Sequence, residues 1–359
     1  MKRDYSQFLP SVSDHRDTRP APTTILQALG WQPFFAQQTS TDEMAVTPPV
    51  RITEGHRAGH HIVGQDIDTR LPPMADATVG DWLLYNRERP GSSRLLERKS
   101  LFKRRAPGTD RKIQLIAANI DTAFIVSSCN HDFNIARLER YMALAFEAQV
   151  VPVIVLTKAD LCEIADDYRA RAEAIANRVP VRILDARGGS PKAVLAEWCA
   201  PGQTLAFLGS SGVGKSTLIN GLSGNGAIAT QGIREDDSKG RHTTTRRHLH
   251  VLPNGCTALD TPGMRELQLT DAKEGVGDVF SDLRDLSEHC RFNDCQHETE
   301  PGCAILKAIE TGAVDGDRLA RWRKLVREER FNASSLAERK RKDRQLGKMI
   351  RQVQLQKRQ

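Results

Sequence analysis

The sequence predicts a multidomain α/β protein, in which a small antiparallel β-barrel is followed by an open sheet flanked by helices and then by a helical unit. Three observations predict this class: short alternating strands between Val46 and Lys112, a glycine-rich segment, Gly209–Ser216, between a strand and a helix, and three cysteines within residues 290–303. A chain of 359 residues has room for two or three such domains. The expected divisions are a flexible extension over 1–45, the barrel over 46–112, the open-sheet domain over 113–272, the cysteine-containing unit over 273–330 and a basic helix or tail over 331–359.

The N-terminal third has the least distinctive patterns. Residues 1–23 are polar and contain three prolines, which is typical of disorder, whereas Thr24–Trp31 has the pattern of a short helix that stops at a glycine. Beyond Val46, alternating stretches broken by glycine and proline predict antiparallel strands that close a small barrel, although their spacing does not distinguish an OB-fold from an SH3-like barrel. The basic segment Arg94–Arg105 is a candidate contact for RNA phosphates.

The segment Gly209–Ser216 has the pattern G-x-x-x-x-G-K-[ST] of a phosphate-binding loop. The apolar run Thr204–Leu208 before it predicts a buried strand, and Lys215–Leu222 predicts a helix start, whereas the alternative is a plain Gly/Ser-rich turn. In such a loop, backbone N–H groups surround the phosphates, the lysine reaches the β/γ oxygens and the hydroxyl binds Mg²⁺. The residues expected at the phosphates are Gly209, Ser210, Ser211, Gly212, Val213, Gly214, Lys215, Ser216 and Thr217.

A second segment indicates which base is bound. Thr157, Lys158, Ala159 and Asp160 follow the apolar run Val150–Leu156, and so lie at the carboxyl end of a predicted strand, where open α/β sheets bind ligands. A carboxylate at this point accepts hydrogen bonds from N1–H and N2–H₂ of guanine, a donor pair that adenine lacks, so Asp160 favours GTP over ATP. A solvated Lys-Ala-Asp turn is the alternative. The segment 185–188 after the next strand is a weaker candidate for backing the base.

The remaining parts of a nucleotide switch follow the phosphate loop. Asp260 follows the predicted strand 256–259, where it supports the Mg²⁺ shell, and Gly263 meets the γ-phosphate. The polar segment 226–245, between the phosphate loop and the stretch 260–263, predicts a switch that is ordered by γ-phosphate and Mg²⁺. In conventional GTPases the base-reading segments come last, whereas here they come first. The sequence therefore predicts a circularly permuted G domain, a rearrangement that proteins tolerate when the old termini lie close together.

The cysteines predict a metal site. Cys290, Cys295 and Cys303 lie in a polar stretch, and together with a histidine they supply the four ligands of a closed, structural Zn²⁺ site. His289 and His297 are both candidates for the fourth ligand. The other four cysteines are scattered singly, which indicates buried thiols in a reducing cytoplasm and no disulfide framework.

Charge and hydropathy indicate the partners. The net charge is +7, and residues 320–359 alone hold 14 Lys or Arg against 4 Asp or Glu. The patterns 318–330 and 336–359 predict helices, and we expect this basic limb to lie on RNA phosphates, although a solvated helix is the alternative. No signal peptide or membrane span is expected, so the prediction is a cytoplasmic protein with no membrane partner.

The rotated motif order, the phosphate loop, the stretch 240–245, the stretch 260–263 and the cysteine cluster together resemble the circularly permuted ribosome-assembly GTPases of the RsgA/YjeQ family, from about residue 46 to about residue 330. The resemblance implies an N-terminal OB-fold barrel, a permuted GTPase domain and a zinc domain, with the small ribosomal subunit and its rRNA as partners and as stimulators of a slow GTPase. It favours His297 as the zinc ligand. One departure is Thr157, where the commoner motif has Asn, and its shorter side chain is expected to weaken nucleotide affinity.

The expected enzyme is a monomeric, Mg²⁺-dependent GTP hydrolase that acts late in small-subunit assembly, alongside other assembly factors. Lys215 neutralises phosphate charge, Ser216 and one threonine of residues 243–245 ligate Mg²⁺, and His242, which the resemblance supports, orients water because Met264 occupies the position of the usual Gln. Two other classes remain open. They are a nucleotide-gated RNA-binding module with negligible turnover and a P-loop ATP enzyme such as a small-molecule kinase.

Overall fold

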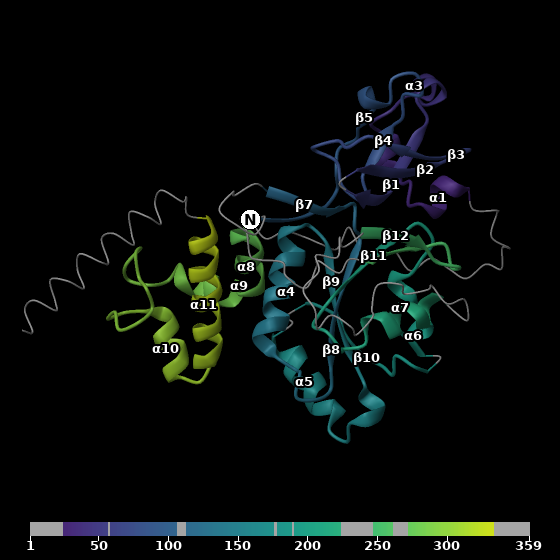
Figure 1. Cartoon of the computed structure of the whole chain (residues 1–359). Coiled ribbons are helices and arrows are strands. Elements are labelled where there is room, and N and C mark those ends of the chain that lie inside the picture. Colours follow the sequence, from purple (N-terminus) through teal and green to yellow (C-terminus); the bar gives the residue numbers. More distant parts are fainter. Residues whose placement is uncertain are drawn as a thin grey trace, which may run out of the picture.

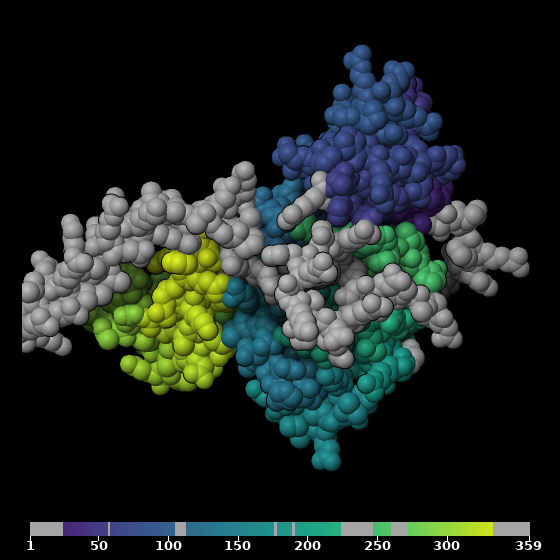
Figure 2. Space-filling view, in the orientation of Figure 1, coloured from purple at the N-terminus to yellow at the C-terminus, as the bar shows by residue number. Residues whose placement is uncertain are grey.

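The computed structural model describes residues 24–56, 58–105, 113–175, 178–188, 190–223, 247–260 and 272–333. Within these ranges we distinguish an N-terminal unit (24–118), a central domain (120–260) and a C-terminal unit (272–333). Figure 1 shows the helical C-terminal unit beside the central domain, with the N-terminal strands above the central domain. In Figure 2 the N-terminal and C-terminal units form separate lobes. No helix in the described ranges is long and apolar enough to span a bilayer.

The N-terminal unit begins with three short helices, α1 (Ile25–Ala28), α2 (Pro33–Ala36) and α3 (Thr41–Val46). Thr24 caps α1 through its hydroxyl, and Gly30 has a φ of +89°, so the short helix predicted for 24–31 is confirmed. Phe35 is fully buried, and its ring centroid lies 5.8 Å from that of Trp82. The expectation of a flexible extension is therefore wrong for residues 24–45, because aromatic burial fixes them on the strands, and residues 1–23 lie outside the described ranges.

Antiparallel strands form the rest of this unit. The order along the sheet is β3-β2-β1-β4-β5, and a separate pair joins β6 to β7. The β6–β7 pair spans the expected boundary at residue 112, so the N-terminal unit extends to Ala118. Antiparallel pairing is confirmed, while closure into an OB-fold barrel stays a prediction. The strands are β1 (Pro49–His56), β2 (Gly59–Gly64), β3 (Ile67–Leu71), β4 (Trp82–Leu84), β5 (Arg94–Leu95), β6 (Leu101–Arg105) and β7 (Ile113–Ala118), with a 3-10 turn at Pro90–Ser92.

The basic segment 94–105 is less available for RNA than the sequence suggested. Its first three basic residues form ion pairs within the protein, because the fold brings acidic residues of other segments against them. The pairs are Arg94 with Glu43, Arg98 with Asp81, and Lys99 with Asp121.

The central sheet has the order β10-β9-β8-β11-β13-β12, and it continues through β12 into β1. Strands β10, β9, β8, β11 and β13 are parallel, whereas β12 pairs antiparallel with β13 and β1. All seven residues of β8 are buried, as expected for a parallel strand covered on both faces. The strands are β8 (Thr122–Ser128), β9 (Val151–Thr157), β10 (Val181–Ile183), β11 (Thr204–Leu208), β12 (Arg247–Val251) and β13 (Thr257–Asp260).

Helices complete the central domain. Helix α4 (Ile135–Glu147) begins at Asn134, whose side chain accepts from the Arg137 backbone N–H, and it buries an apolar face that includes Leu138 and Met142. The phosphate-loop helix expected over 215–222 is α7 (Lys215–Ser223), which is confirmed. The others are α5 (Ala165–Ile175) and α6 (Ser190–Val194), with 3-10 turns at Ala159–Leu161 and Ala196–Trp198.

The C-terminal unit is entirely helical among its described elements. It contains α8 (Lys273–Val279), α9 (Ser281–Ser287), α10 (Ala304–Glu310) and α11 (Gly316–Ala333). The helix expected over 318–330 is therefore confirmed. Arg318 and Arg321 on it form ion pairs with the buried Glu139 of α4, so these two charges serve domain packing and are not free for RNA.

Candidate nucleotide and metal sites

The topology brings the predicted nucleotide segments to one edge of the sheet. The chain passes outward through β8, β9 and β10, then returns to β11 on the other side of β8. Ligands of open α/β sheets bind at such a switch point, beyond the carboxyl ends of the strands. The phosphate loop follows β11, Thr157 ends β9, and Asp260 ends β13, so all three lie at this edge.

Glycines fit the phosphate loop closely against its neighbours. Gly209 has a φ of +146°, and a Cβ at this position would lie 2.3 Å from the Val126 carbonyl oxygen. Only glycine combines this backbone conformation with so close an approach. The Lys215 Nζ donates to the carbonyl oxygen of Gly209 at 2.8 Å and to that of Ser210, which places the ammonium group at the loop, where phosphate charge is expected.

Thr157 bonds to the phosphate loop. Its hydroxyl is fully buried, and it donates to the Val213 carbonyl at 2.6 Å, with the Ser127 carbonyl at 3.2 Å. The threonine hydroxyl thus makes a hydrogen bond to the phosphate loop, because β9 and the loop approach closely enough for this shorter side chain. A hydroxyl has only one proton to donate, and the nearer Val213 carbonyl takes it, so none is left for the nucleotide base. Weakened nucleotide affinity at this position therefore stays a prediction.

The base-reading segments follow neighbouring strands. Lys158 has a φ of 58°, a left-handed turn that starts the 3-10 segment containing the exposed Asp160. After β10, Asp185 Oδ1 accepts from the Arg187 backbone N–H at 2.8 Å, which closes a tight turn. Because β9 and β10 pair in parallel, the two segments 157–160 and 185–188 lie side by side.

Several predicted residues lie outside the described ranges. They are His242, the threonines at 243–245, Gly263 and Met264, and only the backbone of Asp260 is described. In contrast, the structure places Arg137 at the phosphate loop, where its Nη1 donates to Ser210 Oγ. No sequence motif marks this residue. The one sequence signal is its position in the first turn of the helix after β8, a strand that ends at the nucleotide-binding edge of the sheet.

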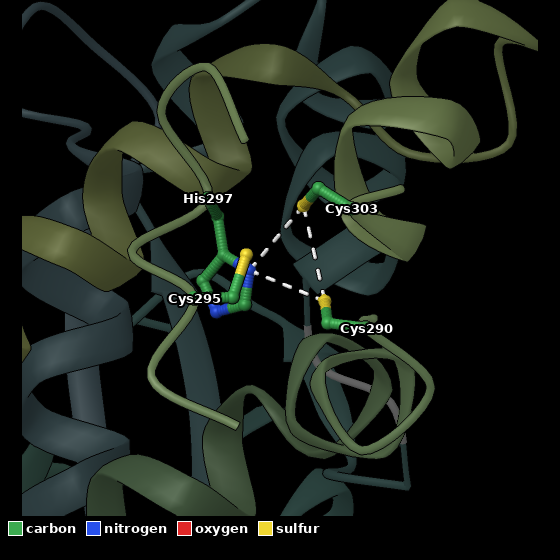
Figure 3. A group of neighbouring side chains, drawn as sticks. All are labelled: Cys290, Cys295, His297 and Cys303. Carbon is green, nitrogen blue, oxygen red and sulfur yellow. Dashed lines mark hydrogen bonds between the residues drawn. The ribbon is translucent and has the colours of Figure 1, made fainter. Parts of the chain in front are cut away.

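The four predicted metal ligands lie together (Figure 3). One ligand atom from each of Cys290, Cys295, His297 and Cys303 lies within 4.8 Å of the others. The Cys290 and Cys303 sulfurs are 3.8 Å apart, and His297 Nδ1 lies 3.6 Å and 3.4 Å from them, respectively. Tetrahedral bonds of about 2.3 Å to sulfur imply a sulfur–sulfur separation of about 3.8 Å, so the donor set fits a four-coordinate ion.

The second histidine candidate does not join this cluster. His289 is exposed, and its Nδ1 lies 2.9 Å from the Asp285 carbonyl oxygen. His297 is buried at 8% exposure, and burial lowers its pKa, which favours the neutral ring that binds metals. His297 has a φ of 58°, so a left-handed turn directs its ring toward the thiols. The geometry thus selects His297 over His289.

A phosphate loop and base-reading segments that meet at the sheet edge in rotated chain order define a circularly permuted P-loop nucleotide-binding protein. The RsgA GTPase family model matches residues 95–270. A relative from Vibrio parahaemolyticus, named small ribosomal subunit biogenesis GTPase RsgA 2, is 47% identical over 95% of this chain and 96% of its own. The chain belongs to the RsgA GTPase family, whose members are circularly permuted P-loop GTP hydrolases.

Solved structures have the same fold. YjeQ from Thermotoga maritima matches 77% of this chain and 96% of its own with a TM-score of 0.57 at 24% identity, and YloQ, described as a circularly permuted GTPase, matches 80% and 96% with a TM-score of 0.54 at 23% identity. An ABC transporter model also matches residues 197–357. That range includes the phosphate loop, a motif common to P-loop proteins, and the full-length relative decides between the two families.

Proposed function

We propose that this protein hydrolyses GTP during late assembly of the small ribosomal subunit and that rRNA contacts stimulate its turnover. The observation that carries the proposal is the bond between Thr157 and Val213, which joins a guanine-type segment to a phosphate loop. The curated relative, named for small-subunit biogenesis, supports the biological role. Because subunits are assembled where ribosomes function, we also propose a cytoplasmic location.

The residues have distinct roles in this proposal. Lys215 neutralises charge on the β- and γ-phosphates, and Asp160 selects guanine through its N1–H and N2–H₂ donors. Mg²⁺, when bound, screens the phosphate charge, and Ser216 with one threonine of 243–245 would hold it, with Asp260 behind them. Gly263 meets the γ-phosphate and His242 orients the attacking water.

The cluster of Cys290, Cys295, His297 and Cys303 holds one Zn²⁺ in this proposal. Three thiolates and an imidazole suit zinc, and four protein ligands leave no open position for catalysis. Its role is therefore structural. It fixes the loop between α9 and α10 and places Trp322 of α11 against the His297 ring, with the ring centroids 5.5 Å apart.

The C-terminal unit also offers a surface for rRNA. With Arg318 and Arg321 engaged by Glu139, the exposed basic residues of α11 are Lys324, Arg327 and Arg330. Phe331 at the end of the same helix is exposed as well, and basic residues together with an aromatic ring suit RNA phosphates and unstacked bases. The predicted basic tail beyond them, 334–359, lies outside the described residues.

Hydrolysis assays with purified small subunits test this function. The unmodified protein should turn over GTP faster with subunits, while Lys215→Ala should lose at least about a hundredfold of the rate, a typical loss for one electrostatic element. His242→Ala should reduce the stimulated rate far more than the basal one. Binding without turnover in both conditions would favour the nucleotide-gated RNA-binding module.

Nucleotide competition tests the base site. Asp160→Asn should shift preference from guanine toward xanthine nucleotides, because the amide pairs with the carbonyl that replaces the amine. Thr157→Asn should tighten GDP binding, since an amide has a second proton for the base, whereas Thr157→Val should weaken binding. Equal competition by ATP in the unmodified protein would favour a kinase-like ATP enzyme instead.

A further inference from the structure

Helix α4 contacts the phosphate loop at its first turn. The Arg137 guanidinium donates to the hydroxyl of Ser210, while the carbonyl of Ser210 accepts from Lys215. The second residue of the loop is therefore held through its side chain by α4 and through its backbone by the phosphate-binding lysine. Any shift of the α4 N-terminus moves a direct partner of the loop.

Two residues further along, the same helix holds the C-terminal unit. The Glu139 carboxylate is fully buried and accepts from Arg321 Nε at 2.9 Å and from Arg318 Nη1 at 3.4 Å. The next residue, Arg140, forms a two-pronged ion pair with Glu328 of α11, with one of its bonds at 2.7 Å. A buried carboxylate without these cations would be costly, so α11 and α4 are held to one relative position.

Backbone packing strengthens this attachment. A Cβ on Gly275 of α8 would lie 2.0 Å from the Ala143 carbonyl oxygen, so α8 and α4 touch backbone to backbone. The Gly275 N–H also donates to Glu147 Oε2 at 3.1 Å. Figure 1 shows α4 between the helices of the C-terminal unit and the central sheet. The helix thus has the phosphate loop at one end and the C-terminal unit along its length.

We propose that α4 couples docking of the C-terminal unit to nucleotide binding, with Arg137 as the positioning residue that connects the helix to the phosphate loop. Movement of the C-terminal unit, for example on a ribosomal surface, shifts α4 and changes how Ser210 is held. This inference rests on the proposal that the phosphate loop binds GTP. It assigns regulation to a helix that precedes the phosphate loop in the chain, separately from the switch segments that follow the loop.

A double-mutant cycle on the full-length protein tests this coupling. Binding of a fluorescent GDP analogue is measured in the unmodified protein, Arg137→Met, Glu328→Gln and the double variant. Arg137→Met should raise Kd about threefold to tenfold, the range in which residues of a coupling network act. Glu328→Gln should raise Kd about threefold in the otherwise unmodified protein. In the double variant it should add almost no further change, because Arg137→Met has already broken the contact between α4 and the phosphate loop.

The control cycle uses Arg169→Met and Glu173→Gln, an exposed ion pair on α5 that joins no second domain. Neither change should alter Kd. Arg137→Lys should restore most of the affinity, because lysine is long and donates to Ser210 Oγ, whereas a purely packing role would not distinguish lysine from methionine. Should Arg137→Met fail to fold, Ser210→Ala removes the same bond from the other side and enters the cycle in its place.

The results separate the two proposals. If guanine nucleotides fail to bind the unmodified protein, the proposed function is overturned and the coupling with it. If they bind normally but Glu328→Gln has the same effect on Kd in both backgrounds, the coupling alone is overturned. An unchanged Kd in a folded Arg137→Met or Ser210→Ala variant likewise overturns the coupling alone.

Discussion

The central domain is joined to its two neighbours in contrasting ways. On the N-terminal side β1 pairs with β12, so one sheet runs through both parts. The buried cation Arg51 reinforces this junction by donating to neutral oxygens, those of Leu29, Gly80, Asn119 and Thr204. Burial lowers the pKa of Arg51 to about 10, with Asp121 and Asp81 opposing the shift.

On the C-terminal side the junction consists of packed helices and charged side chains. Its buried group is an anion, Glu139, and its partners are the cations Arg318 and Arg321. Burial raises the pKa of Glu139, while the two guanidinium groups oppose that shift. The pair of Arg140 with Glu328 keeps more than a quarter of each side chain exposed.

The difference indicates which neighbour is suited to move. Backbone pairing between strands fixes register and direction, so the N-terminal unit is a rigid extension of the sheet. At the C-terminal junction the partly exposed pair of Arg140 with Glu328 can exchange partners with water or with RNA phosphates at small cost, whereas the buried Glu139 keeps its two arginines. The C-terminal unit is therefore the part that suits a regulatory attachment, and four predictions test this contrast.

Disruption of the proposed zinc site should have the largest effect, and only on the C-terminal side of the central domain. In Cys303→Ser a thiolate is lost from the proposed zinc site, where a bound metal would contribute on the order of 10 kcal/mol of local folding free energy. Hydrogen exchange should show loss of protection in α10 and α11, with β1 and β12 unchanged. Cys162→Ser, a matched change in the central domain, should keep one zinc per chain by mass spectrometry. A Cys303→Ser protein with full zinc content would contradict the ligand assignment.

Arg51→Met should destabilise the N-terminal junction by about 3–5 kcal/mol, because removal of the guanidinium leaves several buried oxygens without donors. Denaturant unfolding measures the loss. The matched control is Arg94→Met, which breaks an exposed pair with Glu43 and should cost less than about 1 kcal/mol. Similar losses in both variants would show that this buried cation is not a principal support of the junction.

Glu139→Gln should destabilise the C-terminal junction by about 2–3 kcal/mol, since it leaves two arginines without their buried counter-charge. We expect faster limited proteolysis between the central domain and the C-terminal unit, with the N-terminal junction unaffected. Glu173→Gln, at an exposed pair on α5, serves as the control and should change stability by less than about 0.5 kcal/mol. Unchanged proteolysis in Glu139→Gln would mean that helix packing alone holds the unit.

The smallest expected effect is a pH dependence at Asp282. Burial alone would raise its pKa, but hydrogen bonds from Arg318 hold it below its ordinary value. Such a carboxylate stabilises the fold above its ordinary pKa of 3.8, and this stabilisation is lost as pH falls through the lower folded-state pKa. At pH 6 Asp282→Asn should therefore be less stable than the unmodified protein by about 0.5–1 kcal/mol, a figure reduced by solvent screening.

Stability measured at pH 3 completes that test. The difference between Asp282→Asn and the unmodified protein should be smaller at pH 3 than at pH 6, because the carboxyl group is then partly protonated. A stability difference between the two proteins that grows toward low pH would contradict this prediction. It would show that the pair with Arg318 does not stabilise the C-terminal unit.

Much of the central domain was predictable from short segments of sequence. Strand β11, helix α7 and the order of the nucleotide motifs follow from local apolar runs and glycine spacing. The Cys/His cluster was predictable as well, because its four residues lie within residues 290–303 and their chemistry is specific. In each case the residues that make the structure lie close together in the chain.

Other features depend on segments that only the fold brings together. Thr157 meets Val213 across 56 positions of sequence, and Arg318 meets Glu139 across 179. The sequence showed a hydroxyl and a cation at these positions but not their partners, so Thr157 was expected to weaken nucleotide affinity and the helix that carries Arg318 to lie on RNA. Sequence alone determined local conformation and ligand chemistry. The tertiary structure decided which polar groups satisfy one another, because hydrogen bonds and ion pairs act over a few ångströms of space, whatever the separation along the chain.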